Sequence, residues 1–166
     1  MKTKSQKEPK KTTKTNKASS NHQSTPQNGN SKIKKKSGQK SHTILLVEDD
    51  PVLSRMYSEK FKNEGFNVIH AADGQTALKF AQEKDYDIIL LDVMLPKLSG
   101  IDMLERLRTT PKGKNIPVVT LTNLAEKEEQ ERAIRLGVKE YLIKAMHTPE
   151  KVIAVLKKYI NGKLQS

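Results

Sequence analysis

Short apolar runs alternate with amphipathic stretches from Ser41 to the end of the chain. The runs are largely uninterrupted by polar residues, which is typical of strands buried on both faces of a sheet. They predict five strands, at residues 43–47, 66–69, 88–91, 116–121 and 138–143.

Between these runs, apolar residues recur at the spacing of one helix face. Asp50 followed by Pro51 makes a suitable cap and first turn for the first helix, and Asp73-Gly74 opens the second. A stripe that starts at Ile101 predicts the third. The last two predicted helices span residues 125–137 and 149–160.

Five strands that alternate with five helices imply right-handed crossovers and a single parallel sheet. The sequence therefore predicts an α/β fold over residues 41–166. Its centre is a doubly wound, five-stranded parallel sheet with helices on both faces.

Polar residues stand where several of these strands end. Glu48 and Asp49 follow the first strand, Asp92 the third, Thr122 the fourth and Lys144 the fifth. Ligands of open parallel sheets bind at the carboxyl ends of the strands, so we expect these side chains to converge there. Taken singly, each would be interpreted as a helix cap, a loop acid or a solvated side chain.

Three clustered carboxylates resist ionisation unless a cation joins them, and their oxygens suit Mg²⁺. Thr122 offers a hydroxyl donor and Lys144 a positive charge, as a phosphoryl group on Asp92 would require. The pattern predicts Mg²⁺-dependent phosphoryl transfer onto Asp92 by positioning and charge neutralisation.

The positive charge is concentrated in residues 1–40. They contain 12 Lys and one acidic residue, Glu8, and so carry +11 of the net charge of +12. Their clearly apolar residues are only Met1, Ala18 and Ile33, which predicts a disordered, Lys-rich tail. Such a tail either aids solubility or contacts a polyanion, although no aromatic residue interleaves the lysines for base stacking.

The composition excludes several classes of protein. The chain has no Cys, which rules out disulfides, thiolate metal sites and a cysteine nucleophile. It has no apolar window of about 18 residues for a transmembrane helix, and no apolar region of a secretory signal. These features predict a cytoplasmic protein without a membrane span.

The motifs resemble the receiver domain of bacterial two-component response regulators. The resemblance rests on residues 44–49 (ILLVED), 90–96 (LLDVMLP), 99–100 (SG), 117–122 (PVVTLT) and 141–144 (YLIK). It covers about residues 42–162 and implies a flavodoxin-like sheet with strand order 2-1-3-4-5. It also implies a phospho-accepting signalling domain rather than an enzyme, similar to single-domain chemotaxis regulators.

The resemblance further implies individual roles. Asp92 would be the phospho-acceptor and would receive its phosphoryl group from a sensor histidine kinase or a phosphotransfer protein. Asp49, Asp92 and the backbone carbonyl of Met94 would bind Mg²⁺ directly, and Glu48 would bind it through water.

The family pattern also implies a switch. Thr122 and Lys144 would contact the phosphoryl oxygens, and Tyr141 would be the aromatic residue whose rotamer responds. Two positions depart from the pattern: Ala145 stands where the family usually has Pro, and Asn123 where it has a small residue. A cis bond before Ala costs about 3 kcal/mol, so we expect a trans or strained loop there.

The function predicted first is therefore a stand-alone receiver that acts through an unknown downstream partner. An aspartyl phosphatase would need a second Asp where Met94 stands, and a dinucleotide enzyme would need a glycine-rich turn at residues 48–51. The alternative is a nucleic-acid-associated protein that acts through residues 1–40.

Overall fold

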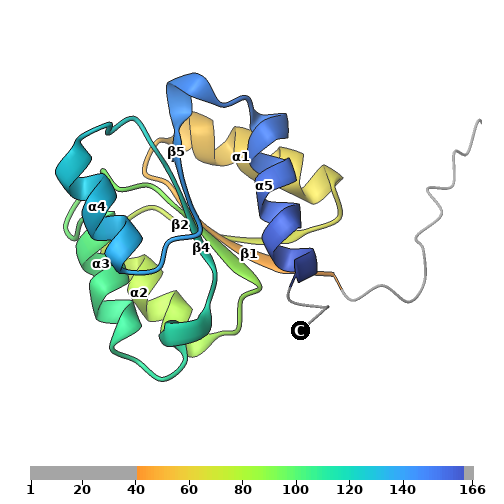
Figure 1. Cartoon of the computed structure of the whole chain (residues 1–166). Helices are drawn as coiled ribbons and strands as arrows, with labels where there is room; N and C mark the ends of the chain where they lie inside the picture. The colour runs from red at the N-terminus through yellow and green to blue at the C-terminus, as the bar shows by residue number, and fades with distance from the viewer. Residues whose placement is uncertain (1–40, 163–166) are drawn as a thin grey trace, which may run out of the picture. The chain divides into compact units, whose positions relative to one another are not determined.

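The computed structural model describes residues 41–162, which form a five-stranded parallel sheet in the order β2-β1-β3-β4-β5 (Figure 1). This order confirms the predicted flavodoxin-like topology. The predicted tail, residues 1–40, lies outside the described residues. The strands are β1 (Thr43–Val47), β2 (Asn67–Ala71), β3 (Ile88–Leu91), β4 (Val118–Thr122) and β5 (Glu140–Ile143).

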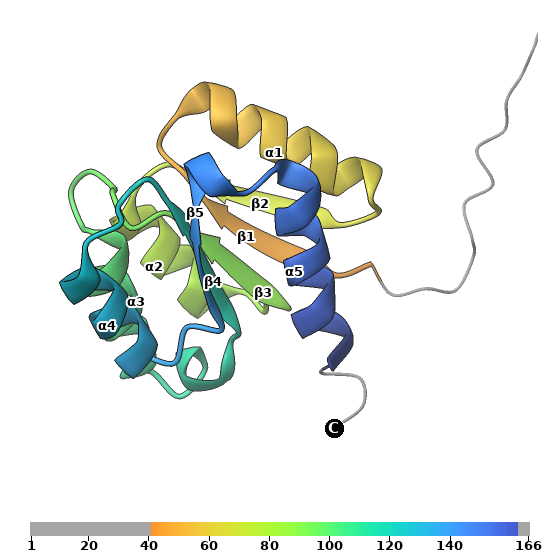
Figure 2. The same ribbon diagram turned by 45° about the horizontal axis from the view of Figure 1, so that its top comes forward.

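Helices cover both faces of the sheet, with α1 and α5 on one face and α2, α3 and α4 on the other (Figure 2). None of the helices within residues 41–162 combines the length and the apolar character needed to cross a bilayer. The elements are α1 (Pro51–Asn63), α2 (Gly74–Glu83), α3 (Gly100–Arg108), α4 (Lys127–Arg135) and α5 (Pro149–Gly162), with short 3₁₀ helices η1 (Gly113–Asn115) and η2 (Lys144–Met146).

The central strand β1 shows why its sequence is apolar throughout. Ile44 and Leu46 point into the core beneath α1 and α5, whereas Leu45 and Val47 point into the core beneath α2 and α3. All four side chains are at most 1% exposed. Successive residues of a strand face opposite sides, so a strand covered on both sides needs apolar residues at every position.

Three predicted strands had boundaries that were wrong by one or two residues. The β2 pairing begins after Phe66 and continues to Ala71, which pairs with Val47. β4 begins two residues later than predicted and ends at Thr122, whose pairing with Ile143 extends the ladder. β5 begins at Glu140 rather than at residue 138. The predicted strands begin too early because apolar residues mark burial, and buried residues continue beyond the part of the backbone that pairs with a neighbouring strand.

Helix α4 is shorter than the predicted span of 125–137. Glu126 takes the cap position with an extended backbone, so the helix starts at Lys127. At the other end, Gly137 has a φ of +74°, a left-handed conformation that favours glycine and ends the helix.

The first helix is capped as predicted. The Asp50 carboxylate accepts hydrogen bonds from the backbone N–H groups of Val52 (2.7 Å) and Leu53 (2.9 Å). Pro51 occupies the first position of the helix, where its missing N–H costs nothing. Because Asp50 is engaged in this cap, Glu48 and Asp49 are the acids left at the end of β1.

Candidate functional site

The carboxyl edge of the sheet gathers the predicted acidic residues. Carboxylate oxygens of Glu48, Asp49 and Asp92 lie within 4.8 Å of one another. Glu48 and Asp92 are buried, at 2% and 5% exposure, whereas Asp49 is exposed. Oxygen ligands at this separation, one of them open to solvent, form a donor set that fits Mg²⁺ with some of its waters retained.

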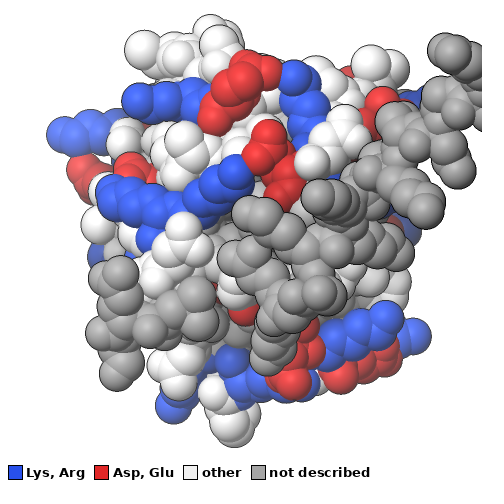
Figure 3. Space-filling model, turned by 90° about the vertical axis from the view of Figure 1, so that its right-hand side faces the viewer, with Lys and Arg blue, Asp and Glu red and all other residues white. Residues whose placement is uncertain are grey.

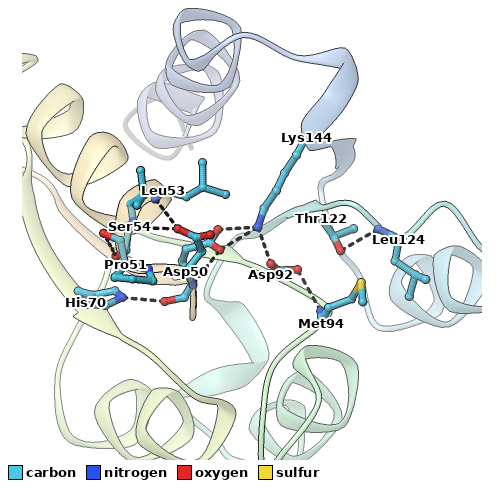
Figure 4. A network of polar contacts seen from close by, with 12 residues as sticks. Asp50, Pro51, Leu53, Ser54, His70, Asp92, Met94, Thr122, Leu124 and Lys144 are labelled. Carbon is cyan, nitrogen blue, oxygen red and sulfur yellow. Dashed lines mark hydrogen bonds and ion pairs between the residues drawn. The ribbon is translucent and has the colours of Figure 1, made fainter.

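Lys144 projects from the end of β5 into this acidic cluster (Figure 4). Its Nζ lies 2.5 Å from Oδ2 of Asp92 and 2.7 Å from Oε2 of Glu48. The Lys144 side chain is only 10% exposed. The sequence predicted the convergence of these residues but not the contact between Lys144 and Glu48, which are 96 positions apart.

The electrostatics follow from this burial. Burial acts to lower the pKa of Lys144, but its hydrogen bonds to Asp92 and Glu48 outweigh burial and raise the pKa. For Glu48 burial is the largest influence, and it raises the pKa of the carboxyl although Lys144 opposes it. One ammonium group contacts two of the three carboxyl groups of the cluster, so the cluster can accept more positive charge.

The backbone fixes the position of Asp92. Its N–H donates to the carbonyl of Val47 (2.9 Å), which ties the end of β3 to β1. Its Oδ1 accepts a hydrogen bond from the N–H of Met94 (3.0 Å), while Oδ2 faces Lys144. Gly100 lies against the same residue: a Cβ there would collide with the Asp92 carbonyl, so only glycine lets α3 start this close.

Glu48 is held from its other side by β2. The Nε2 atom of His70 lies 2.8 Å from the Glu48 carbonyl oxygen, and Figure 4 shows the ring directed at this group. The Glu48 N–H donates to the carbonyl of Ala71 (3.1 Å). These contacts hold the backbone of the acidic pair in register with the sheet.

Thr122 and Tyr141 occupy neighbouring strands and meet at the loop that follows β4. Thr122 is fully buried, and its Oγ1 accepts a hydrogen bond from the N–H of Leu124 (3.1 Å). The Tyr141 hydroxyl donates to the carbonyl of the same residue (3.0 Å). The hydroxyl of Thr122 is thus oriented by the loop, and Leu124 connects it with Tyr141.

A second charged pair at this edge was not anticipated from the sequence. Asp73, the cap of α2, accepts hydrogen bonds from Lys97 Nζ (2.8 Å) and from the N–H of Thr76 (2.9 Å). These bonds, the one from Lys97 first, lower the pKa of Asp73 to about 2. Lys97 has a φ of +66°, and its ion pair with Asp73 ties the loop after Asp92 to the start of α2.

Helices α3 and α4 are also joined by charge near the site. Arg132 of α4 contacts Asp102 (3.1 Å) and Glu105 (3.3 Å) of α3. It also contacts Glu129 (3.2 Å) within α4. Only the last pair has a local sequence signal, because it is spaced three residues apart on one helix.

Comparison with known proteins gives the class. The sequence profile of the response regulator receiver domain matches residues 44–157. The chain therefore belongs to the response regulator receiver domain family of two-component signalling. Members of this family are phospho-accepting signalling modules that bind Mg²⁺ in an acidic cleft, and they are not classical enzymes.

Curated relatives are longer regulators. The chain is 37% identical over 111 residues to the probable transcriptional regulatory protein TcrX of Mycobacterium tuberculosis, covering 67% of this chain and 47% of that protein. It is 40% identical over 112 residues to the transcriptional regulatory protein CpxR of Escherichia coli, covering 68% and 47%. The chain thus matches about half the length of these relatives.

Solved structures agree with this assignment. The chemotaxis protein CheY4 of Vibrio cholerae aligns with a TM-score of 0.67 and 28% identity, over 72% of this chain and 99% of that one. The receiver domain of the sensor histidine kinase PA1611 from Pseudomonas aeruginosa aligns with a TM-score of 0.67 and 30% identity, over 74% and 99%. That structure has a magnesium ion coordinated in its active-site cleft.

Proposed function

We propose that Asp92 accepts a phosphoryl group from a phosphohistidine of a sensor histidine kinase or a phosphotransfer protein. A carboxylate oxygen of Asp92 forms the new O–P bond while the P–N bond to the donor imidazole breaks. The imidazole leaves with the electron pair and takes a proton from solvent. The buried position of Asp92 between Lys144 and the Met94 N–H supports this role, because both contacts hold the carboxylate in one orientation.

We further propose which residues hold the metal. Asp49, Asp92 and the Met94 backbone carbonyl would bind Mg²⁺ directly, and Glu48 would bind it through water. When bound, the ion supplies positive charge that offsets the carboxylates and the incoming phosphoryl oxygens. Lys144 supplies a fixed charge from the end of β5, and in the phosphorylated state it pairs with a phosphoryl oxygen.

The proposed output runs through Thr122. A phosphoryl group on Asp92 offers new acceptor oxygens, toward which the Thr122 hydroxyl turns. The loop at Leu124 then loses one of its two side-chain hydrogen bonds, and Tyr141 can change its packing on β5. A downstream protein that binds the α4–β5 surface would sense this change between two discrete arrangements.

The observation that carries the proposal is the contact of a single ammonium group with both Asp92 and Glu48, inside a cluster of three carboxylates. The test is intact-mass spectrometry of the full chain after incubation with acetyl phosphate. One phosphoryl group should be added with Mg²⁺ and none with EDTA. Asp92→Asn should abolish the addition, whereas the exposed Asp85→Asn should not.

If phosphorylation continues without Mg²⁺, or persists in Asp92→Asn, the proposal is wrong.

A second candidate function rests on the charge of residues 1–40, +11 in a segment with few apolar residues. We propose polyanion contact by this segment as a property separate from phosphorylation.

A further inference from the structure

A cavity of about 470 Å³ lies at the amino-terminal edge of the sheet, opposite the edge that carries Asp92. The segments around it are the end of α3, η1, the end of α4 and the residue before β5, which meet at the lower end of the sheet in Figure 1. None of the described residues that line it is acidic. Four of them are basic: Arg108, Lys114, Arg135 and Lys139.

Arg108 is the best-anchored of these cations. Its Nε donates to the carbonyl of Leu136 (2.9 Å), and its Nη1 donates to the carbonyls of Ile116 (3.0 Å) and Gly113 (2.5 Å). These bonds join α3 to the end of α4 and to the start of β4. They leave the Nη2 group without a hydrogen bond inside residues 41–162, so its donors are available to a ligand.

The charge of Arg108 has no counter-ion within residues 41–162. No carboxylate of the described part of the chain lies within 4.0 Å of it, and all its partners are neutral carbonyl groups. Burial lowers the pKa of its guanidinium group, with no neighbouring charge to oppose this. A half-buried cation held only by carbonyls is stabilised when an anion arrives beside it.

Most other basic side chains of residues 41–162 are paired with acids. On the face at the right of Figure 1, basic and acidic side chains lie next to one another (Figure 3). Between α1 and α5, Lys60 pairs with Glu150, and Lys157 pairs with Glu64 at the end of α1.

The cavity differs from that surface in its charge balance. Among the described residues, Lys114 and Lys139 have no carboxylate within 4.0 Å, and both are exposed. Arg135 has only Glu131, at 4.0 Å. Three cations without a carboxylate partner among the described residues, Arg108, Lys114 and Lys139, thus lie around one hollow.

We propose that this cavity is a binding site for a small compound with several phosphate groups, either a pyrophosphate or a nucleoside polyphosphate. Lysine ammonium groups supply point charges, and a guanidinium fork matches phosphate oxygens. The volume falls in the range of sites for small molecules and cofactors, and exceeds what one inorganic phosphate would need. The site lies at the opposite edge of the sheet from the acidic cluster and does not depend on it.

The test is a titration of the ¹⁵N-labelled full chain with pyrophosphate and, separately, with ATP, in Mg²⁺-free buffer with EDTA. The amides of Lys114, Asn115, Gly137 and Lys139 should shift and saturate. In the double variant Lys114→Gln/Lys139→Gln, affinity should fall about tenfold or more, as expected for lost charge-assisted contacts.

A matched control removes the same charge elsewhere. Lys62 and Lys84 are exposed, lie outside the cavity and have no carboxylate within 4.0 Å among the described residues. The variant Lys62→Gln/Lys84→Gln should keep the wild-type affinity.

The two ligands distinguish the sources of phosphate. Tighter binding of ATP than of pyrophosphate identifies a nucleotide, and equal binding identifies phosphate groups alone; both support the site. Equal losses in the two double variants, or shifts confined to residues 1–40 or to the neighbours of Asp92, overturn it. Asp92→Asn should leave the binding of pyrophosphate and ATP at the cavity unchanged. The test of the cavity is therefore separate from the test of Asp92 phosphorylation.

Discussion

Thr122 and Tyr141 are linked through the peptide groups of one residue, Leu124. The Thr122 hydroxyl accepts from its N–H, and the Tyr141 hydroxyl donates to its carbonyl. Thr122 ends β4 at the edge of the sheet that carries Asp92, whereas Tyr141 is partly exposed on β5. A change in the hydrogen bonding of Thr122 would therefore act on Tyr141 through two hydrogen bonds of the loop rather than through the sheet.

This link predicts that Thr122→Ala accepts a phosphoryl group on Asp92 but transmits the resulting structural change poorly to β5. In wild type, phosphorylation should change the amide shifts of residues 138–143, and in Thr122→Ala this change should shrink markedly. Tyr141→Phe should uncouple the same segment, with a loss of about 1 kcal/mol in unfolding free energy from the missing hydrogen bond. Equal shift changes in wild type and Thr122→Ala would refute the coupling.

Neighbouring acids at the end of β1 are expected to have different roles. Asp49→Ala should strongly reduce Mg²⁺ affinity, because Asp49 is the exposed oxygen donor of the cluster. Asp50→Ala should lower the melting temperature, since two N–H groups of α1 lose their acceptor, and should leave Mg²⁺ affinity nearly unchanged. Calorimetric titration measures the Mg²⁺ affinity of both variants, and thermal unfolding measures their melting temperatures. A loss of Mg²⁺ affinity confined to Asp50→Ala would mean that the acidic pair is misassigned.

The Asp73–Lys97 pair predicts a specific dependence of stability on pH. The folded state lowers the pKa of Asp73 from 3.8 to about 2, so its stabilising contribution is present above pH 3.8 and is lost as the pH falls through 2. Asp73→Ala should cost about 1 kcal/mol at pH 7, a value that allows for the exposure of Lys97. Urea unfolding at pH 7 and pH 2 measures this cost, which should be clearly smaller at pH 2, where the Asp73 carboxyl group of the folded state is only partly ionised; an equal cost at both would contradict the assignment.

Residues 1–40 predict a salt-dependent interaction. If they contact a polyanion, binding of the full chain to a short DNA duplex should weaken steeply with salt and show little sequence preference. A chain that starts at Ser41 should lose this binding but keep the phosphorylation of Asp92. Fluorescence anisotropy measures the first and intact mass the second. Absence of duplex binding at low salt would leave the solubilising role, and loss of phosphorylation on truncation would contradict the separation.

The local patterns of the sequence predicted five parallel strands and the edge where the site forms, whereas the strand order came from the resemblance to receiver domains. Apolar runs such as Ile88–Leu91 mark strands covered on both sides, and polar residues after them fall at one edge of a parallel sheet. The exact ends of β2 and β4 did not follow, since pairing depends on the neighbouring strand and not on the strand's own residues.

Contacts between distant residues were the part that the sequence could not supply. Lys97 reaches Asp73, and Arg132 reaches Asp102, through long side chains whose partners are set by the packing of helices and loops. Neither pair has a spacing that marks it. The basic cavity could not be predicted for the same reason, since Arg108 at the end of α3 and Lys139 just before β5 come together only in the folded domain.

The central claim is that Asp92 forms an acyl phosphate. The most direct measurement is borohydride reduction of the full chain after incubation with acetyl phosphate and Mg²⁺, followed by peptide sequencing, because reduction converts an aspartyl phosphate to homoserine. The account predicts homoserine at position 92, and none when Mg²⁺ is withheld. Homoserine at another aspartate, or a phosphoryl group that resists base and maps to a Ser or Thr, would contradict it.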